Sequence, residues 1–238
     1  MCILWKYVTH AMCLNVCNLK NTFMKKHYIF DKNSFKFILY IKGAYDMNLK
    51  EKKIGFIITG VNYAIKNTII EMKNLVKRQA RIVPIISEEC YMENTKYGRI
   101  EDYIIEIEQI TKQRVRSKLN EIESIGYSEK LDIIIIAPAS GNIIGKLANN
   151  INEDIATNTV KAHLRDERPV VIAIATNDGL SGSSENIGKL LNRKNYYFVP
   201  FRQDNPITKP RSIAFSPSYL TKTIECALDG EQIQPILI

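Results

Sequence analysis

The sequence lacks any apolar segment long enough to cross a membrane. Its continuous apolar runs are short, such as Ile133–Ala139, whereas a transmembrane helix needs about 20 residues. The N-terminus does not resemble a signal peptide, because polar residues interrupt each of its apolar stretches and no small-residue cleavage site follows. We therefore expect that the protein is not bound to a membrane.

Cysteine and histidine are also scarce. There are five cysteines and three histidines, and Cys13 and Cys17 are four residues apart without a second pair that would complete a zinc site. We predict no metal centre. An odd number of cysteines without a signal peptide favours the reducing cytoplasm.

Positive charge is concentrated in the first 46 residues. The formal net charge is +8, and residues 1–46 hold seven lysines against two acids, which is an excess of five. The remaining 192 residues therefore contribute only three positive charges. No basic face interleaved with aromatic residues follows, so we expect no nucleic-acid binding.

Residues 1–46 form an irregular extension without a clear helical or strand period. A short charged lead from Met47 then opens into an apolar strand, as in many α/β domains. Our hypothesis is that Met47 is the biological start and that residues 1–46 are translated from upstream sequence. A flexible or partner-binding arm is the alternative. The second predicted unit is a domain at 47–238.

From residue 47 onward, apolar strands alternate with amphipathic helices. We expect strands at 54–59, 81–86, 132–137, 169–175 and 196–200, and helices at 63–78, 100–111, from 141, 154–165, 184–191 and 218–228. This alternation predicts an α/β fold with a three-layer, Rossmann-like parallel sheet and helices on both faces. Ligands of such sheets bind at the carboxyl ends of the strands.

The first strand ends in Thr59-Gly60-Val61-Asn62. Gly60 permits a sharp turn into a helix, whose free N–H groups favour an anion, while Thr59 or Asn62 can add a hydrogen bond. Asn62 stands where a dinucleotide fingerprint has its second glycine. A plain strand-to-helix turn with an N-cap is the alternative.

The third strand ends in Pro138-Ala139-Ser140-Gly141-Asn142. Small residues allow a flat ring to approach the backbone, and Ser140 and Asn142 can bind a ligand or cap the next helix. We expect an aromatic cofactor here, with a purely structural cap as the alternative.

This motif resembles the flavin-contacting motif of the family that contains phosphopantothenoylcysteine decarboxylase and lantibiotic cysteine decarboxylases. The family's usual Thr is Ile143 here. Its Pro-x-Met-Asn segment corresponds to Ile174–Asn177, in which only the Asn is kept. Thr59-Gly60-Val61 resembles the phosphate-side loop of the family.

Within that family, 47–238 resembles the dipicolinate synthase B subunits. The distinctive segments are 53–60, 135–138, 146–149, 168–178, 186–191, 197–204 and 232–235. The resemblance implies a flavodoxin-like fold, bound FMN, trimer-based homo-oligomers and a partner A chain with NADP. It also implies oxidation of a dihydrodipicolinate-type precursor to dipicolinic acid for the spore core, in the mother-cell cytoplasm.

The resemblance also implies which residues contact the flavin. The phosphate end would meet the first loop, the ring would meet the third loop, and Thr176 and Asn177 would reach a neighbouring subunit's flavin. Ser87, after the second strand, is a further candidate. The complete expected set is Thr59, Gly60, Val61, Asn62, Ser87, Pro138, Ala139, Ser140, Gly141, Asn142, Thr176 and Asn177.

A small dicarboxylate substrate would need cationic partners, and arginine binds carboxylates through two parallel hydrogen bonds. The candidates are Arg165, Arg168, Arg202, Lys209 and Arg211. The segment 201–211 concentrates charge and proline after a strand, although a solvated loop would have the same composition. The catalytic base stays unassigned.

The chain departs from the decarboxylases in lacking a histidine after the second strand. His163 is the only histidine beyond residue 27, and we expect it on a helix surface. Cysteine decarboxylation is therefore disfavoured. Two alternatives to a redox flavoprotein stay open: a scaffold subunit with weak or no flavin, and a flavin-dependent decarboxylase of another substrate.

Overall fold

The structure, a computed structural model, describes residues 49–60, 63–88, 90, 97–121 and 130–238. Residues Met47–Ile238 group into one compact unit by their internal contacts. The predicted extension at 1–46, together with Val61 and Asn62 of the first loop, lies outside the described residues.

Five parallel strands form the centre of the fold. They are β1 (Lys53–Ile58), β2 (Arg81–Ile86), β3 (Ile133–Ala139), β4 (Val170–Thr176) and β5 (Tyr196–Phe198). All seven residues of β3 and of β4 are buried, as expected for strands with helices on both faces. These five predicted strands are confirmed to within a few residues at their ends.

The strand order is β2-β1-β3-β4, with β5 on the far side of β4. In β1, Phe56 pairs with Pro84 of β2 on one side and Ile135 of β3 on the other. The chain therefore proceeds in opposite directions from β1, and the switch point lies between β1 and β3. This order is that of flavodoxin-like folds, which bind ligands at this point.

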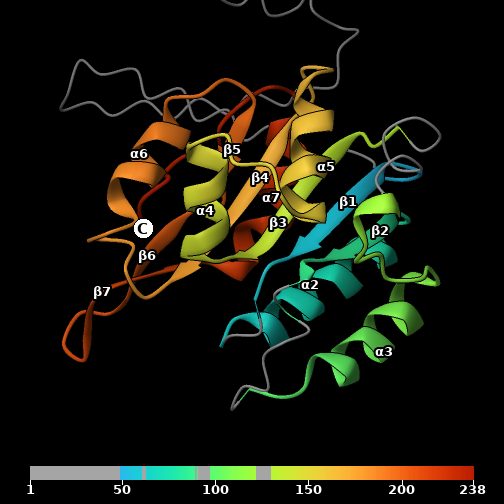
Figure 1. Cartoon of the computed structure of the whole chain (residues 1–238), viewed down its shortest axis with the longest axis horizontal. Coiled ribbons are helices and arrows are strands. Elements are labelled where there is room, and N and C mark those ends of the chain that lie inside the picture. The colour runs from blue at the N-terminus through green and yellow to red at the C-terminus, as the bar shows by residue number, and fades with distance from the viewer. Residues whose placement is uncertain (1–48, 61–62, 89, 91–96, 122–129) are drawn as a thin grey trace, which may run out of the picture. The chain divides into compact units, whose positions relative to one another are not determined.

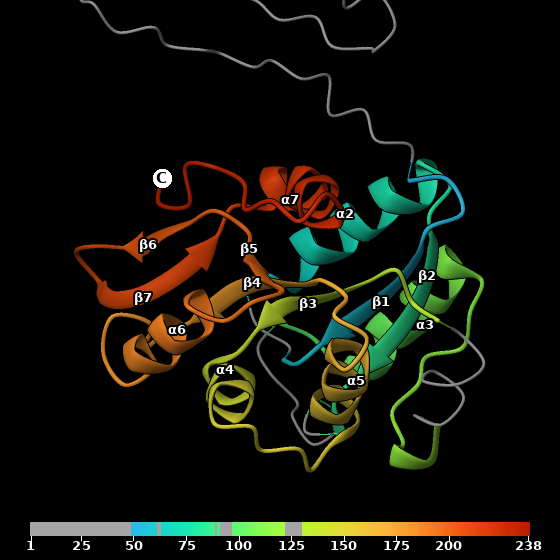
Figure 2. The same cartoon turned by 90° about the horizontal axis from the view of Figure 1, so that it is seen from above.

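Helices cover both faces of the sheet (Figure 2). The α-helices are α2 (Ile65–Lys77), α3 (Ile100–Thr111), α4 (Gly141–Ala148), α5 (Ile155–Leu164), α6 (Ser184–Leu191) and α7 (Leu220–Leu228). Single 3₁₀ turns occur at Leu119–Glu121 and Pro217–Tyr219. The predicted three-layer architecture is confirmed.

Each face of the sheet has its own hydrophobic core. The core beneath α2, α3 and α7 contains the fully buried Phe56 and Met72, whereas the core beneath α4, α5 and α6 contains Ile136 and Phe198. Alternate residues of each central strand enter opposite cores because successive side chains point to opposite faces. The sheet therefore holds the loops at its carboxyl edge in fixed positions.

An antiparallel hairpin extends the sheet beyond β4 (Figure 1). It consists of β6 (Phe201–Asn205) and β7 (Lys209–Phe215), and β7 pairs with the last two residues of β4. The parallel sheet that the sequence predicts is present, and the antiparallel hairpin makes the complete sheet mixed at this edge. The segment 201–211, for which a solvated loop was the alternative, is mostly strand. Its residues are largely exposed and charged, so they show no apolar strand pattern.

Pro138 does not end the third strand as its position suggested. The register between β3 and β4 shifts between Ile136 and Ala139, so that an extra residue is accommodated as a β-bulge. Proline is tolerated at a bulge because the ladder hydrogen bond is already interrupted there. Strand β3 consequently continues to Ala139, and Ser140 follows it at the carboxyl edge of the sheet.

None of the helices in the described ranges has both the length and the apolar character that a membrane span requires.

Candidate functional site at the switch point

Two loops predicted to bind the flavin lie next to each other and are joined by hydrogen bonds. The hydroxyl of Thr59 donates to the carbonyl oxygen of Pro138 at 2.9 Å and accepts from the backbone N–H of Ser140 at 3.2 Å. Thr59 is buried, while Ser140 is half-buried. The β1 and β3 loops therefore form one side-by-side pair at the switch point.

The N-terminus of α4 is closed by protein groups. Ser140 is its N-cap, and the hydroxyl accepts from the backbone N–H of Ile143 at 3.4 Å. Gly141, the first helical residue, packs against three oxygens from the end of β4 and the loop after it. A side chain there would place Cβ within 2.8–2.9 Å of oxygens of Thr176, Asp178 and Ser183. The start of α4 is therefore capped by Ser140, as the sequence allows, and its backbone at Gly141 lies close to the end of β4 and the loop after it.

The N-terminus of α2 is different in its chemistry. The N-cap position is Ala64, which has no side-chain oxygen, and the first turn Ile65–Thr68 contains no acid and one cation, Lys66. Backbone N–H groups at a helix N-terminus favour an anion. This helix begins shortly after Thr59 and Gly60, where sequence reasoning expects the flavin phosphate.

The β6–β7 hairpin reaches the start of α2. The ammonium of Lys209 lies 5.3 Å from the centre of the Tyr63 ring and 3.0 Å from Asp204 Oδ2. The Tyr63 hydroxyl donates to the carbonyl oxygen of Ile213 at 3.3 Å. Burial, reinforced by Asp204, raises the pKa of Tyr63 to about 12, so this phenol stays protonated at neutral pH.

Ser87 lies after β2, on the other side of β1. It is buried, its N–H donates to the carbonyl oxygen of Ile58 at 3.0 Å, and its hydroxyl lies 3.3 Å from Cys90 Sγ. The structure therefore brings Ser87 to the end of β1, with its side chain engaged by Cys90.

The cationic candidates divide between the two ends of the sheet. Lys209 lies beside the start of α2, and Arg202 and Arg211 are exposed on the same hairpin. Arg168 instead donates to the carbonyl oxygen of Leu131, ahead of β3, and forms an ion pair with Asp166. The structure thus places Arg168 at the amino end of the strands, away from the switch point.

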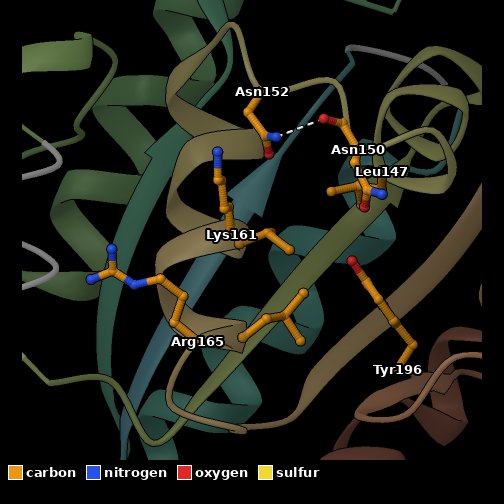
Figure 3. A pocket seen from close by; sticks show the side chains of 8 residues that line it. Leu147, Asn150, Asn152, Lys161, Arg165 and Tyr196 are labelled. Atoms are coloured by element: carbon orange, nitrogen blue, oxygen red, sulfur yellow. Dashed lines mark hydrogen bonds between the residues drawn. The ribbon is translucent and has the colours of Figure 1, made fainter.

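Arg165 is also remote from the two loops. It lines a 420 Å³ cleft between the last turns of α4 and α5 and the start of β5. Figure 3 shows its guanidinium turned away from Leu147 and Tyr196, which lie on the other side of this cleft. Since α4 begins after β3 and returns along the sheet, its last turn lies at the amino end of the strands.

His163 is buried, and its predicted place on a helix surface was wrong. Nε2 lies 3.0 Å from the carbonyl oxygen of Pro169, and burial lowers the pKa of the imidazole to about 4. The neutral imidazole links α5 to Pro169, the residue before β4, which accounts for the burial of His163. Its contact is structural and lies far from the paired loops.

Sequence reasoning missed Asp178 and Ser183. Asp178 accepts from the Thr176 hydroxyl at 2.5 Å and from the Ser183 hydroxyl at 2.9 Å. The available signal is a polar Thr-Asn-Asp run at the end of a buried strand, of which the family resemblance implies only Thr176 and Asn177 as flavin contacts. Thr176 is buried with its hydroxyl engaged, whereas Asn177 is exposed.

The site combines one helix N-terminus suited to an anion with a second that Ser140 caps and the Asp178 carboxylate adjoins. Polar groups lie at both loops, at the ends of strands whose residues are buried. No group of three or more metal-ligating side chains occurs among the residues that the structure describes. No histidine lies at this edge in the described chain, since His163 is at the other end.

Comparison with known proteins identifies relatives of this chain. A family model described as Flavoprotein matches residues 42–209. The B subunit of dipicolinate synthase from Bacillus subtilis is 35% identical over 191 residues, which cover 80% of this chain and 96% of that protein. The crystal structure of the dipicolinate synthase B subunit from Bacillus halodurans matches with a TM-score of 0.74 and 38% identity, over 81% of this chain and 98% of that one.

A more distant match shows the same fold. The FMN-dependent cysteine decarboxylase SpaF matches with a TM-score of 0.57 and 18% identity, over 76% of this chain and 97% of that one.

Proposed function

The chain belongs to the flavoprotein family, and we propose that it acts as the B subunit of a dipicolinate synthase, with FMN bound at the β1–β3 switch point. The observation that carries this proposal is the pairing of the β1 and β3 loops through Thr59, next to a helix N-terminus without an acid. The similarity to two dipicolinate synthase B subunits supports the assignment within the family.

In this proposal the residues of the two loops hold opposite ends of the flavin. Backbone groups after Thr59 and Gly60, with Val61 and Asn62, hold the phosphate at the start of α2. Pro138, Ala139, Ser140, Gly141 and Asn142 approach the ring, and Ser87 closes the β2 side. Bound flavin would supply reversible transfer of two electrons.

The proposed reaction is the oxidation of a dihydrodipicolinate-type precursor to dipicolinic acid. The precursor would lose two hydrogens, one as a hydride, for which oxidised NADP on a partner A chain or oxidised flavin would supply the acceptor, and one as a proton to solvent or a base. Lys209, with Arg202 and Arg211 on the same hairpin, is the best-placed cationic group for a dicarboxylate. Arg165 and Arg168 are not proposed as substrate ligands because they lie at the other end of the strands.

The assembly and cellular setting are part of the same proposal. Thr176 and Asn177 follow β4 at the edge of the site, where the exposed Asn177 can reach a neighbouring subunit's flavin in a trimer-based homo-oligomer. The protein would act in the mother-cell cytoplasm of a spore-forming bacterium, together with its A chain.

A scaffold subunit without flavin is the second candidate. It is favoured by the buried Ile143 and Ile174, which replace polar or proline positions of the family's flavin motifs. In that case this chain would complete the assembly while the A chain performs the redox step. A decarboxylase of another substrate has less support because no histidine in the described chain reaches the site.

The test is the visible absorption spectrum of the purified full chain, before and after addition of FMN and removal of free flavin. We expect flavin bands in the wild type and their loss in the Ser140→Ala/Asn142→Ala double variant. The matched control is Asn149→Ala/Asn192→Ala, which removes two exposed side chains at the C-terminal ends of α4 and α6. A colourless wild type that ignores added FMN would leave the scaffold subunit as the better assignment.

A further inference from the structure

The carboxylate of Asp178 is held beside the N-terminus of α4 by hydroxyl groups. Oδ1 accepts from Thr176 Oγ1 at 2.5 Å, and both carboxylate oxygens accept from Ser183 Oγ at 2.9 Å. The backbone carbonyl of Asp178 also accepts from the N–H groups of Ser181 and Ser183 at 2.9 and 3.2 Å. These bonds fix the position of both the side chain and the backbone.

The carboxylate lies against the first residue of α4. A Cβ on Gly141 would meet Asp178 Oδ1 at 2.9 Å, and Ser183, which completes the arrangement, is 3% exposed. In the described part of the chain, the hydrogen-bond partners of the carboxylate are hydroxyls and not cations. Its negative charge is therefore stabilised by the Thr176 and Ser183 hydroxyls and lies beside the N-terminus of α4.

The start of α2 has the opposite character. Its first turn contains Lys66 and no acid, and Lys209 lies beside the preceding Tyr63. An anionic group placed between the two helices is thus attracted to α2 and repelled by Asp178 at α4. The polarity of the site is set by residues at both ends.

We propose that Asp178 is a positioning residue that fixes the direction of the flavin in the site. The carboxylate excludes the flavin phosphate from the N-terminus of α4, so that the phosphate lies at α2 and the ring lies over 138–141. This inference rests on the proposed function, since it requires that a flavin binds. Asp178 is also the charged group next to the ring in this arrangement.

A fixed negative charge beside the ring has a measurable consequence. Reduction adds electrons to the ring, and a neighbouring carboxylate makes that addition less favourable because like charges repel. Removal of the charge should therefore raise the midpoint potential of the bound flavin. Removal of a hydrogen bond to the carboxylate, with the charge kept, should leave the potential nearly unchanged.

The experiment measures two quantities on the FMN-loaded full chain: the flavin midpoint potential, and the ratio of the affinities for FMN and riboflavin. Asp178→Asn should raise the potential and leave the affinity ratio unchanged. Ser183→Ala is the matched control, since it loosens the same carboxylate without removing its charge, and Asp178→Glu should restore a potential near that of the wild type.

The opposite end of the site is tested by Lys66→Glu, with Lys77→Glu in the last turn of α2 as its control. Lys66→Glu should lower the preference for FMN over riboflavin about threefold to tenfold and leave the potential unchanged. If Asp178→Asn does not fold, Asn177→Lys places a cation at the exposed adjacent position and should raise the potential in the same way.

Each outcome decides a separate point. A wild type that binds no flavin removes the proposed function and this inference with it. A wild type that binds FMN, with equal potentials in the wild type, Asp178→Asn and Asn177→Lys, overturns the inference alone. The inference also falls if Ser183→Ala shifts the potential as far as Asp178→Asn, because Asp178 would then act only as a structural tether.

Discussion

The N-termini of α2 and α4 lie at the same carboxyl edge of the sheet, on opposite faces, yet their surroundings are opposite in charge. At α4, Ser140 caps the helix and the carboxylate of Asp178 adjoins Gly141. At α2, the first turn has a lysine and no acid, although the same edge of the sheet positions it. The two helix N-termini therefore differ in chemistry: side chains of the protein occupy the N-terminus of α4, whereas that of α2 is suited to an external anion.

The largest effect is expected from a substitution at the N-terminus of α4. Gly141→Ala places Cβ within 2.8–2.9 Å of three oxygens, so the loop after β4 must move. Overpacking of this kind costs about 3 kcal/mol in the free energy of unfolding, and we expect flavin binding to be lost with it. Urea denaturation and an FMN titration measure both effects.

Gly188→Ala is the matched control, because a Cβ on this helical glycine meets nothing within 4 Å. It should stabilise the protein by about 0.5–1 kcal/mol through the higher helix propensity of alanine. Equal stability of the two variants would contradict the close packing at Gly141.

The stability of the fold should depend on pH through a residue at the amino end of the strands, away from the proposed flavin site. The pKa of buried His163 is lowered from 6.5 to about 4, so the unfolded chain binds a proton in this interval that the folded chain does not. Stability from the neutral imidazole is present above pH 6.5 and is lost as the pH falls toward 4, by about 3 kcal/mol.

His163→Gln should flatten this part of the stability curve, measured by urea denaturation between pH 4 and 7. The affinity for FMN should be unaffected by the substitution at neutral pH, because His163 lies at the amino end of the strands. A loss of FMN affinity in this variant at pH 7 would show that the two ends are coupled.

Thr59→Val tests the link between the β1 and β3 loops. The variant keeps the shape of the side chain but removes the bonds to the Pro138 carbonyl and the Ser140 N–H. We expect a loss of about 1–2 kcal/mol in stability and a weaker affinity for FMN. Thermal denaturation and FMN titration give the two values.

The control for this variant is Thr111→Val, whose hydroxyl donates to Ile107 in the last turn of α3, away from the site. It should change stability by less than about 0.5 kcal/mol and leave FMN affinity unchanged. If Thr111→Val weakens FMN binding as much as Thr59→Val, the link between the loops is not the cause.

The smallest effect is expected at the hairpin. Lys209→Gln removes a cation that lies near the start of α2 and is partly neutralised by Asp204. The affinity for FMN should fall about threefold, whereas that for riboflavin, which has no phosphate, should not change. Lys194→Gln, an exposed lysine paired with Glu167, is the matched control and should leave both affinities unchanged.

Most of the sheet could be predicted because burial on both faces requires strands that are apolar throughout. The unbroken run of isoleucine and alanine at 133–137 allows few other interpretations, and the helices between strands have regular apolar stripes. The β6–β7 hairpin could not be predicted in this way. Few residues of the hairpin outside the end of β7 are buried, and Arg202 and Lys209 made the segment resemble a solvated loop.

The meeting of the β1 and β3 loops could also be predicted from the parallel sheet. Strand ends in a parallel sheet must meet at one edge, which places Thr59 and Ser140 together without knowledge of their side chains. The position of Asp178 depends on a turn after β4 whose hydroxyl partners come from Thr176 and Ser183. Likewise, the remoteness of Arg165 and Arg168 depends on the path by which α5 returns to the start of β4, which charge alone does not reveal.

One measurement tests the central claim most directly: equilibrium titration of the flavin-free full chain with FMN and with riboflavin. If α2 holds the phosphate and α4 faces the ring, FMN should bind about tenfold to a hundredfold more tightly than riboflavin, and added salt should reduce the difference. Equal affinities for the two flavins would contradict the assignment of the phosphate to α2, and binding of neither would contradict the flavin site itself.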